Sequence, residues 1–341
     1  MSNPGPMTMK DLAEHFHVSV ATVSRALSDN PRISKERREA IQAYARQQNF
    51  TPNIIGAHLR HSKSRPVKMI GVIIPQLPHY FFSTILAGIE EEASAHGYLV
   101  LMAKSNEEYD REVRICQSFF KNQVCGLIVS LAKDTHNFDH FRLFIDHQIP
   151  IVFYDRICTG IDTSRVVVDD YTGAYNAVSH LIERGYHRIA FYCSDMTMQI
   201  SKNRYNGYKD ALFKHGMKVD ESLVYLCDNR AAAELLTPQV LAEPNHPDAF
   251  FAVNDDTAIG ILYATKKFGL RVPEDVGICG FTNGERAVAT DPQLTTVEQR
   301  GKRIGEEAAN ILISQVEGLL PIDHVEKRLV RTKLLIRGTT R

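Results

Sequence analysis

Four apolar runs of similar length follow one another at nearly regular spacing, and this pattern constrains the fold more than any other feature of the chain. The starts of successive runs lie 24 to 29 residues apart, about the size of a β-α-β unit. The runs are Met69–Ile74, Tyr98–Ala103, Cys125–Ser130 and Ile149–Tyr154, and predicted helices lie between them at Phe81–His96, Asp110–Asn122 and Phe138–His147. Because each run is almost continuously apolar, we expect a parallel sheet covered by helices on both faces.

A second series of the same kind begins after Asp155. Its predicted strands are Arg188–Cys193, Leu223–Leu226, Asp248–Val253 and Val276–Phe281, and its predicted helices are Tyr171–Arg184, Lys202–His215, Ala231–Ala242 and Thr257–Phe268. Two doubly wound α/β lobes in succession place a cleft at the carboxyl ends of their strands, where ligands bind in this architecture. A length of 341 residues leaves room for such a body and a further small domain.

The first 68 residues differ in charge from the rest of the chain. They hold eleven Lys and Arg residues against five Asp and Glu, a net charge of +6, whereas the remainder holds 29 against 35, a net charge of −6. A basic segment joined to an acidic body favours a polyanionic partner for the small segment alone.

Residues 7–48 are predicted to form three short helices, each preceded by a side chain that can cap it. The caps are Thr8, with Asp11 in capping-box position, Ser19 and Ser34. A short, capped second helix set against the first is the arrangement of a helix-turn-helix, here over Met9–Ser28. A plain three-helix bundle that binds no nucleic acid is the alternative interpretation.

The second predicted helix, Val20–Leu27, presents one face that is suited to reading DNA. Its outward residues are Val20, Ala21, Ser24 and Arg25. The Arg25 guanidinium is able to pair with O6 and N7 of guanine, and the small apolar residues are able to meet thymine methyl groups. Three further residues are candidates for phosphate contacts, namely Thr22, Ser34 and Lys35.

A nine-residue amphipathic segment, Asn53–His61, follows, with Asn53 as its cap. It is too short to persist as an isolated helix in water, so its order must depend on other contacts. Leu59, flanked by basic residues such as Arg60, fits a minor-groove wedge, in which the leucine separates base pairs and its neighbours hold phosphates. An ordinary linker helix is the alternative.

Several classes of protein are disfavoured by what the sequence lacks. No strand is followed by GxGxxG, and neither GxxxxGK[ST] nor GxSxG occurs, so we expect no enzyme and no cofactor. The six cysteines show no metal-ligand spacing, so we expect no metal site and reduced thiols. No apolar run reaches membrane-spanning length, and Met1–Pro6 lacks the features of a secretory signal. We therefore expect a cytoplasmic protein with no membrane partner, in preference to a periplasmic binding protein.

Motifs along nearly the whole chain resemble those of the lactose-repressor (LacI/GalR) family. In the first 53 residues they are Met9–Ala13, Val18–Leu27, Ile33-Ser34 and Asn49–Asn53. In the body they include Ile70–Pro75, Gly88–Glu90, Gly126–Val129, His180–Gly185, Arg204–Tyr208, Asn254-Asp255, Gly269–Val276 and Leu294–Val297. Their order and gaps match the family throughout, although no single motif decides the matter.

The resemblance implies a headpiece at residues 1–52, a hinge helix and linker at 53–68, and a body of periplasmic-binding-protein type at 69–341. It implies a first lobe at about 69–168 and 297–321 and a second lobe at about 169–296 and 322–337, with helix 301–315 on the first. It also implies a homodimer on palindromic operator DNA, with Val20, Ala21 and Arg25 as base readers and Leu59 as the wedge. No leucine-heptad tail follows Arg337 to support a tetramer.

Effector binding between the lobes is also implied, with a sugar, sugar derivative or nucleoside as the ligand. The matching cleft positions are His79, Phe81, Phe82, Asp155, Arg204, Asn254, Asp255, Thr282 and Gln299. Thr282 stands where the family often has an acidic residue that binds a ligand hydroxyl, so no particular sugar is indicated. Alternative roles are a loop cap for Asp155, a surface ion pair for Arg204 and a solvated loop for His79. We expect one of the two phenylalanines in the core and the other against the ligand.

Overall fold

The computed structural model describes residues 7–48, 50, 68–76, 80–158 and 160–341. The chain divides into two compact units, residues 1–67 and residues 68–341, which are described separately below. The candidates Asn53, Leu59, Arg60 and His79, and with them the hinge segment 53–61, lie outside the described residues.

The first unit contains three helices, α1 (Met9–His15), α2 (Val20–Leu27) and α3 (Lys35–Gln47). Thr8 and Asp11 form the predicted capping box, and the Ser19 side chain accepts a hydrogen bond from the Thr22 N–H. Ser34 stands at the N-cap position of α3 but makes no capping hydrogen bond with its side chain, so that prediction is wrong in its chemistry. The six residues that fill the small core are Leu12, Ala13, Val23, Ala26, Ile41 and Ala45.

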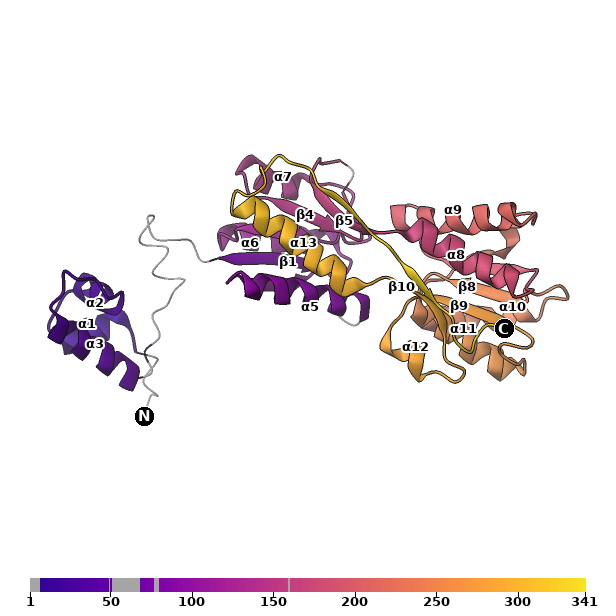
Figure 1. Ribbon diagram of the computed structural model, residues 1–341, viewed down its shortest axis with the longest axis horizontal. Helices are drawn as coiled ribbons and strands as arrows, with labels where there is room; N and C mark the ends of the chain where they lie inside the picture. Colours follow the sequence, from indigo (N-terminus) through magenta and orange to yellow (C-terminus); the bar gives the residue numbers. More distant parts are fainter. Residues whose placement is uncertain (1–6, 49, 51–67, 77–79, 159) are drawn as a thin grey trace. The chain divides into compact units, whose positions relative to one another are not determined.

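The second unit is built on two six-stranded sheets, one in each lobe (Figure 1). The first sheet has the order β11-β5-β4-β3-β1-β2, and all its pairings are parallel. Its strands are β1 (Met69–Ile74), β2 (Leu99–Lys104), β3 (Gly126–Val129), β4 (Ile151–Tyr154), β5 (Ser164–Val168) and β11 (Lys327–Val330). Its helices are α5 (Tyr80–Ala95), α6 (Tyr109–Lys121), α7 (Asp139–Asp146) and α13 (Gly301–Val316).

The second sheet has the order β12-β10-β9-β8-β6-β7, in which only the edge strand β12 is antiparallel. Its strands are β6 (Ile189–Cys193), β7 (Val224–Leu226), β8 (Ala249–Ala252), β9 (Gly277–Thr282), β10 (Thr295–Glu298) and β12 (Lys333–Leu335). Its helices are α8 (Asp170–Glu183), α9 (Gln199–Lys214), α10 (Arg230–Leu241), α11 (Asp255–Phe268) and α12 (Glu285–Ala289), with a 3₁₀ turn at Glu221–Leu223.

Alternate residues of the strands pack on opposite faces of each sheet. Ile70 and Val72 pack beneath α5 and α13, while Ile73 packs with the layer that contains α6 and α7. In the second lobe Phe191 packs with residues of α8 and α9, whereas Tyr192 packs with those of α10 and α11. Covered faces of this kind explain why the strands are apolar along their whole length.

The chain passes between the lobes three times, after β5, after β10 and after β11, and Figure 1 shows these connections between the two sheets. Helix α13 packs on α5 in the first lobe, as expected. The expected division of the C-terminal segment is wrong in one part. Residues 327–330 were assigned to the second lobe, but β11 pairs in parallel with β5 and extends the first sheet, so the chain crosses only after Val330.

Candidate functional site

The candidate DNA-reading residues lie on one exposed side of α2. Val20, Ala21 and Arg25 are exposed and Ser24 is half-buried, while Val23 and Ala26 face the core from the same helix. The turn after α2 is fixed by an ion pair from Arg38 to Asp29 at 2.7 Å and by a hydrogen bond from the Gln42 amide to the Ala26 carbonyl at 2.9 Å. The exposed face is therefore presented on a helix that is anchored at both ends.

The candidate phosphate contacts surround this face. Thr22 is half-buried, and its hydroxyl lies 2.9 Å from that of Ser19. Ser34 and Lys35 are exposed at the start of α3. A helix start has unpaired backbone N–H groups, which favour an anion there, and an exposed lysine adds to this attraction.

A cavity of about 280 Å³ lies between the two lobes, at the carboxyl ends of strands from both sheets. The predicted residues that line it are Phe81, Phe82, Asp155, Arg204, Asn254, Thr282 and Gln299. An adjoining pocket of about 480 Å³ shares Phe81, Asn254 and Thr282 with it and is also lined by Asp255. The structure thus brings the described members of the predicted set to one place, although they are far apart in the sequence.

Arg204 is held by the protein on several sides. Its guanidinium contacts the Asp170 carboxylate at 2.7 and 2.8 Å, donates to the Val253 carbonyl at 2.5 Å and lies 3.9 Å from the centroid of the Phe281 ring. Burial raises the pKa of Asp170 to about 6, although the positive charge of Arg204 opposes this rise. Arg204 is only 5% exposed, so the surface ion pair considered for it is excluded.

Asn254 and Asp255 have structural partners of their own. The Asn254 side chain caps α11 by accepting from the Thr257 N–H at 2.8 Å and donates to the Asp228 carbonyl at 2.8 Å. Asp255 accepts from the Thr296 hydroxyl at 2.5 Å and from the Gly284 N–H at 2.7 Å. Burial raises the pKa of Asp255 to about 6, against the effect of these two hydrogen bonds.

The remaining predicted residues differ in their burial and in their contacts with the rest of the protein. Phe81 and Phe82 are 8% and 5% exposed, and both belong to the core and to the cavity wall, so the expected division between them is wrong. Asp155 is buried and has a left-handed backbone with φ of 56°. The Gln299 side chain is 3% exposed and makes no hydrogen bond within the described part of the chain.

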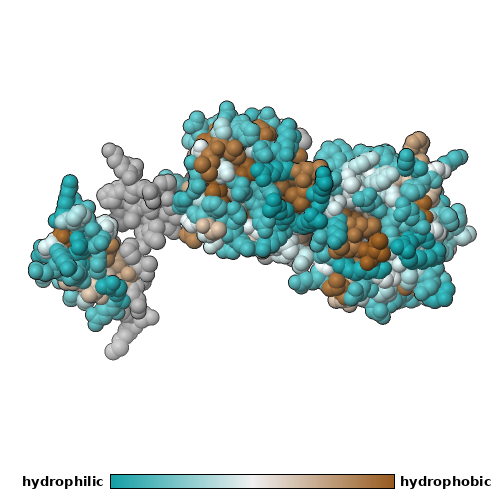
Figure 2. Space-filling view, in the orientation of Figure 1, coloured by the Kyte–Doolittle hydropathy of each residue, from teal (hydrophilic) through white to brown (hydrophobic). Residues whose placement is uncertain are grey.

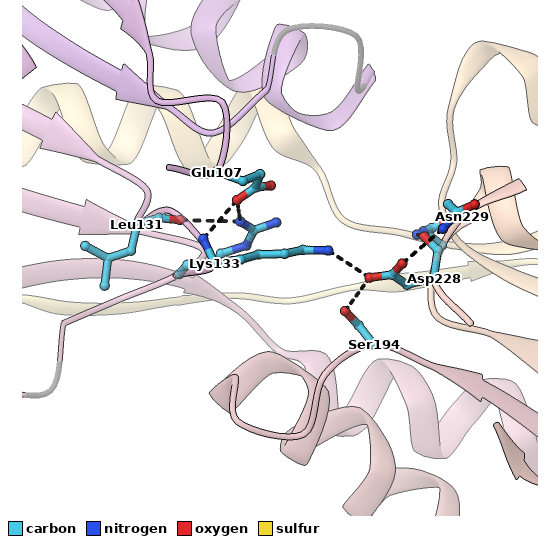
Figure 3. Close-up of polar contacts among 8 residues, drawn as sticks. Glu107, Leu131, Lys133, Ser194, Asp228 and Asn229 are labelled. Atoms are coloured by element: carbon cyan, nitrogen blue, oxygen red, sulfur yellow. Dashed lines mark hydrogen bonds and ion pairs between the residues drawn. The ribbon is translucent and has the colours of Figure 1, made fainter. Parts of the chain in front are cut away.

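Sequence reasoning missed a polar cluster that joins the cleft walls (Figure 3). Lys133, after β3, donates its ammonium to the Asp228 carboxylate, after β7, at 2.8 Å, and Ser194 donates to the same oxygen at 2.8 Å. Glu107 accepts from Arg156 at 2.5 Å and from the Lys133 N–H at 3.0 Å. Each of these residues follows a strand, and this position in the sequence could have indicated that they lie at the cleft.

The cleft is equipped to bind a polar molecule. It combines aromatic rings with amide, hydroxyl and charged groups, the usual composition of a small-molecule site. Within the described residues no group of three or more His, Cys, Asp or Glu side chains is placed to hold a metal ion. No helix among them is long and apolar enough to cross a membrane.

Comparisons with known proteins agree with this architecture. Residues 8–53 match the family of bacterial regulatory proteins of lacI type, and residues 67–336 match the family of periplasmic binding proteins and the sugar-binding domain of the LacI family. The transcriptional repressor CytR of Escherichia coli K12 is 33% identical over 340 residues, covering 98% of this chain and 96% of the repressor. The ribose operon repressor of Halalkalibacterium halodurans is 31% identical over 336 residues, covering 98% of this chain and 97% of its own.

Among solved structures, the lac repressor dimer bound to operator and an anti-inducer superposes with a TM-score of 0.82 at 24% identity, covering 98% of this chain and 99% of that one. This likeness concerns the fold. The helix-turn-helix unit and the two-lobed body together define a DNA-binding regulator with a domain of periplasmic-binding-protein type. The chain belongs to the LacI family and is a transcriptional repressor of that family.

Proposed function

We propose that this repressor binds a palindromic operator as a homodimer and that a small polar effector in the cleft changes its affinity for the operator. The main support for this proposal is that both lobes contribute to the cavity wall. The first lobe supplies Phe81 and Asp155, and the second supplies Arg204 and Asn254. A ligand that contacts both walls favours one separation of the lobes over another. Such a differential interaction is what coupling between two sites requires.

In this proposal Val20, Ala21, Ser24 and Arg25 read bases from the exposed side of α2, while Thr22, Ser34 and Lys35 contact phosphates. The hinge residues Asn53, Leu59 and Arg60 act at the centre of the operator, with Leu59 as the wedge. The division into headpiece 1–52, hinge and linker 53–68 and body 69–341 belongs to the same proposal. Since operator DNA is the target, the protein acts in the cytoplasm.

The effector is a sugar, a sugar derivative or a nucleoside, because the cleft offers hydrogen-bonding groups beside aromatic rings. Gln299 is the best residue for testing this role, since its amide has no partner within the described residues and its replacement breaks no protein hydrogen bond. Asp155 and Arg204 belong to the same proposed site.

The test measures binding of the full-length protein to DNA from its own upstream region by fluorescence anisotropy, with and without a library of sugars and nucleosides. We expect specific binding that one compound alters, and we expect Gln299→Leu to weaken the response to that compound without weakening effector-free DNA binding. Binding to operator and random DNA with equal affinity would refute operator recognition. An unchanged response in Gln299→Leu would remove this residue from the site.

A further inference from the structure

The positive charges of the cleft all have carboxylate partners within the protein. Lys133, Arg156 and Arg204 are the cations among the described residues that line the cavity. Their partners are Asp228 at 2.8 Å, Glu107 at 2.5 Å and Asp170 at 2.7 Å, respectively. Arg286 in the adjoining pocket is paired in the same way with Asp256 at 3.0 Å. Each of these cations is therefore already neutralised by a carboxylate, although Nε of Arg156 is buried and has no hydrogen-bond partner among the described residues.

The pair between Lys133 and Asp228 has a fixed geometry although it is partly exposed. The loop that carries Lys133 is held at two adjacent backbone positions, because the Ala132 N–H donates to Glu112 at 2.9 Å and the Lys133 N–H donates to Glu107 at 3.0 Å. Glu112 is completely buried and also accepts from the Thr135 hydroxyl at 2.9 Å. The lysine therefore leaves its loop from a set position that points it at Asp228 (Figure 3).

Asp228 is held on the opposite wall. Its carboxylate accepts from Ser194 at 2.8 Å as well as from Lys133. Burial tends to raise the pKa of Asp228, but the hydrogen bonds from Lys133 and Ser194 outweigh it and leave that pKa below its ordinary value. The carboxylate therefore stays charged at neutral pH and continues to neutralise the lysine.

Besides Nε of Arg156, a deeply buried uncharged group of this cleft, the amide of Gln299, also lacks a partner among the described residues. The Gln299 side chain is 3% exposed, lines the cavity and makes no hydrogen bond within the described residues. A primary amide offers two donors and an acceptor with two lone pairs. These groups match a ligand hydroxyl or amide, which both donates and accepts.

We propose that the cleft selects an uncharged, hydrogen-bonding effector and rejects the phosphorylated form of the same compound. This inference rests on the proposed function and specifies the chemical class of its ligand. A phosphate group that enters the cavity loses hydration and meets Asp155 and Asp228, while the cations it needs are already bound to carboxylates. A neutral hydroxyl compound exchanges its hydrogen bonds with water for bonds to Gln299 without this loss.

The first experiment compares matched probes on the full-length protein by isothermal titration calorimetry. The probes are ribose and ribose 5-phosphate, glucose and glucose 6-phosphate, each common ribonucleoside and its 5′-monophosphate, and inorganic phosphate. We expect any compound that binds to do so at least about tenfold more tightly than its phosphorylated form, a difference of about 1.4 kcal/mol. We expect no binding of inorganic phosphate at millimolar concentration.

The second experiment frees one cation. Asp228→Asn keeps the shape of the side chain but removes the charge that neutralises Lys133, so we expect inorganic phosphate and the monophosphates to gain about tenfold in affinity. Glu234→Gln is the matched control, because it removes the partner of Arg230 in an ion pair of 2.6 Å within α10, and it should bring no gain.

The inference is overturned if a phosphorylated probe binds the wild type more tightly than its parent compound, if inorganic phosphate binds the wild-type cleft, or if Asp228→Asn gains no affinity for phosphate. Failure of the proposed function would give a different experimental result. In that case the protein does not distinguish operator from random DNA, or no compound alters its binding to the operator, whatever the charge of the compounds tested.

Discussion

Charged side chains in this protein hold the cleft together as well as line it. Arg204 is an example, because Asp170, the Val253 carbonyl and the Phe281 ring together fix its guanidinium, and a ligand would meet only the remaining edge. Removing one member of a buried ion pair leaves the other charge uncompensated, at a cost of about 3–5 kcal/mol. Alanine at Arg204 would therefore confuse loss of ligand binding with loss of stability, which is why Gln299 is the better position to change.

At the DNA-reading face, Arg25→Ala should reduce affinity for the operator by about 1–3 kcal/mol and relax specificity at one base pair in each half-site. Arg25 is exposed and enters no ion pair within the described residues, so the free protein should keep its stability. Fluorescence anisotropy on operator variants measures the effect. The matched control is Lys35→Ala, which should weaken binding to all sequences alike and flatten the salt dependence. An equal loss on operator and random DNA in Arg25→Ala would contradict base reading.

The buried carboxylate of Asp255 predicts a particular dependence of stability on pH. Its pKa is about 6 in the folded protein, against an ordinary value of 3.8 for an aspartate side chain. A group with a raised pKa binds more protons when folded, so its stabilisation is complete below about pH 4 and is lost as the pH rises through 6. The stability of the wild type relative to Asp255→Asn should therefore fall with rising pH, by up to about 3 kcal/mol.

Urea denaturation at several pH values between about 4 and 7 tests this dependence. Thr296→Val is a useful companion variant, because the Thr296 hydroxyl lowers the pKa of Asp255 and its removal should extend the loss of stability to higher pH. A wild-type advantage that grows as the pH rises would contradict the assignment.

Helix pairs in the body cross closely at glycines. Gly88 of α5 and Gly305 of α13 face the backbone of the partner helix, and a methyl group on either would overlap a carbonyl oxygen, that of Lys302 or that of Ile85. Gly207 of α9 is placed in the same way against the Tyr171 carbonyl of α8. These small residues allow α13, which returns late in the chain, to pack against α5 (Figure 1).

Gly305→Ala should destabilise the body by about 1–3 kcal/mol, since the added methyl group overpacks a rigid backbone contact and outweighs the higher helix propensity of alanine. Thermal or urea unfolding of the full chain measures the loss. Asn310→Ala, on the exposed side of the same helix, is the control and should change stability by less than about 0.5 kcal/mol. A stabilised Gly305→Ala protein would show that the two helices can move apart.

Helices and strands with a clear local sequence pattern could be predicted from the sequence. Elements and contacts that depend on residues far away in the chain could not. The apolar runs predicted eight strands and the helices between them, and the polar residues Thr8 and Ser19 were predicted as helix caps, because these patterns are local. Strand β11 has exposed Lys327 and Leu329 on one side, and only its pairing with β5 places it in the first sheet. Lys133 and Asp228 lie 95 residues apart and meet only because both sheets end at the cleft. The predicted cleft residues came from the family resemblance, whereas the DNA-reading residues of the second helix came from local pattern as well.

The two lobes are joined by three chain crossings and by the Lys133–Asp228 pair. This ion pair links a side chain of the first lobe to one of the second across the cleft. It favours the present arrangement of the lobes even without ligand. Because both side chains are partly exposed, at 41% and 25%, its contribution should lie near the value of about 0–1 kcal/mol that is typical of such pairs.

A neutral effector offers a clean way to detect this contribution. Salt does not act on an uncharged ligand directly, so a dependence of its affinity on ionic strength must arise from charges of the protein that come together on closure. We expect the wild type to bind its effector more weakly as salt rises. Lys133→Met should bind it about two- to fivefold more weakly at low salt and lose most of the salt dependence. Lys302→Met is the control, because the ion pair of Lys302 with Glu91 at 2.6 Å lies within one lobe. This substitution should change neither the affinity for the effector nor its dependence on salt. Calorimetry at several salt concentrations measures them, and a salt dependence in Lys133→Met equal to that of the wild type would show that the pair does not contribute to closure.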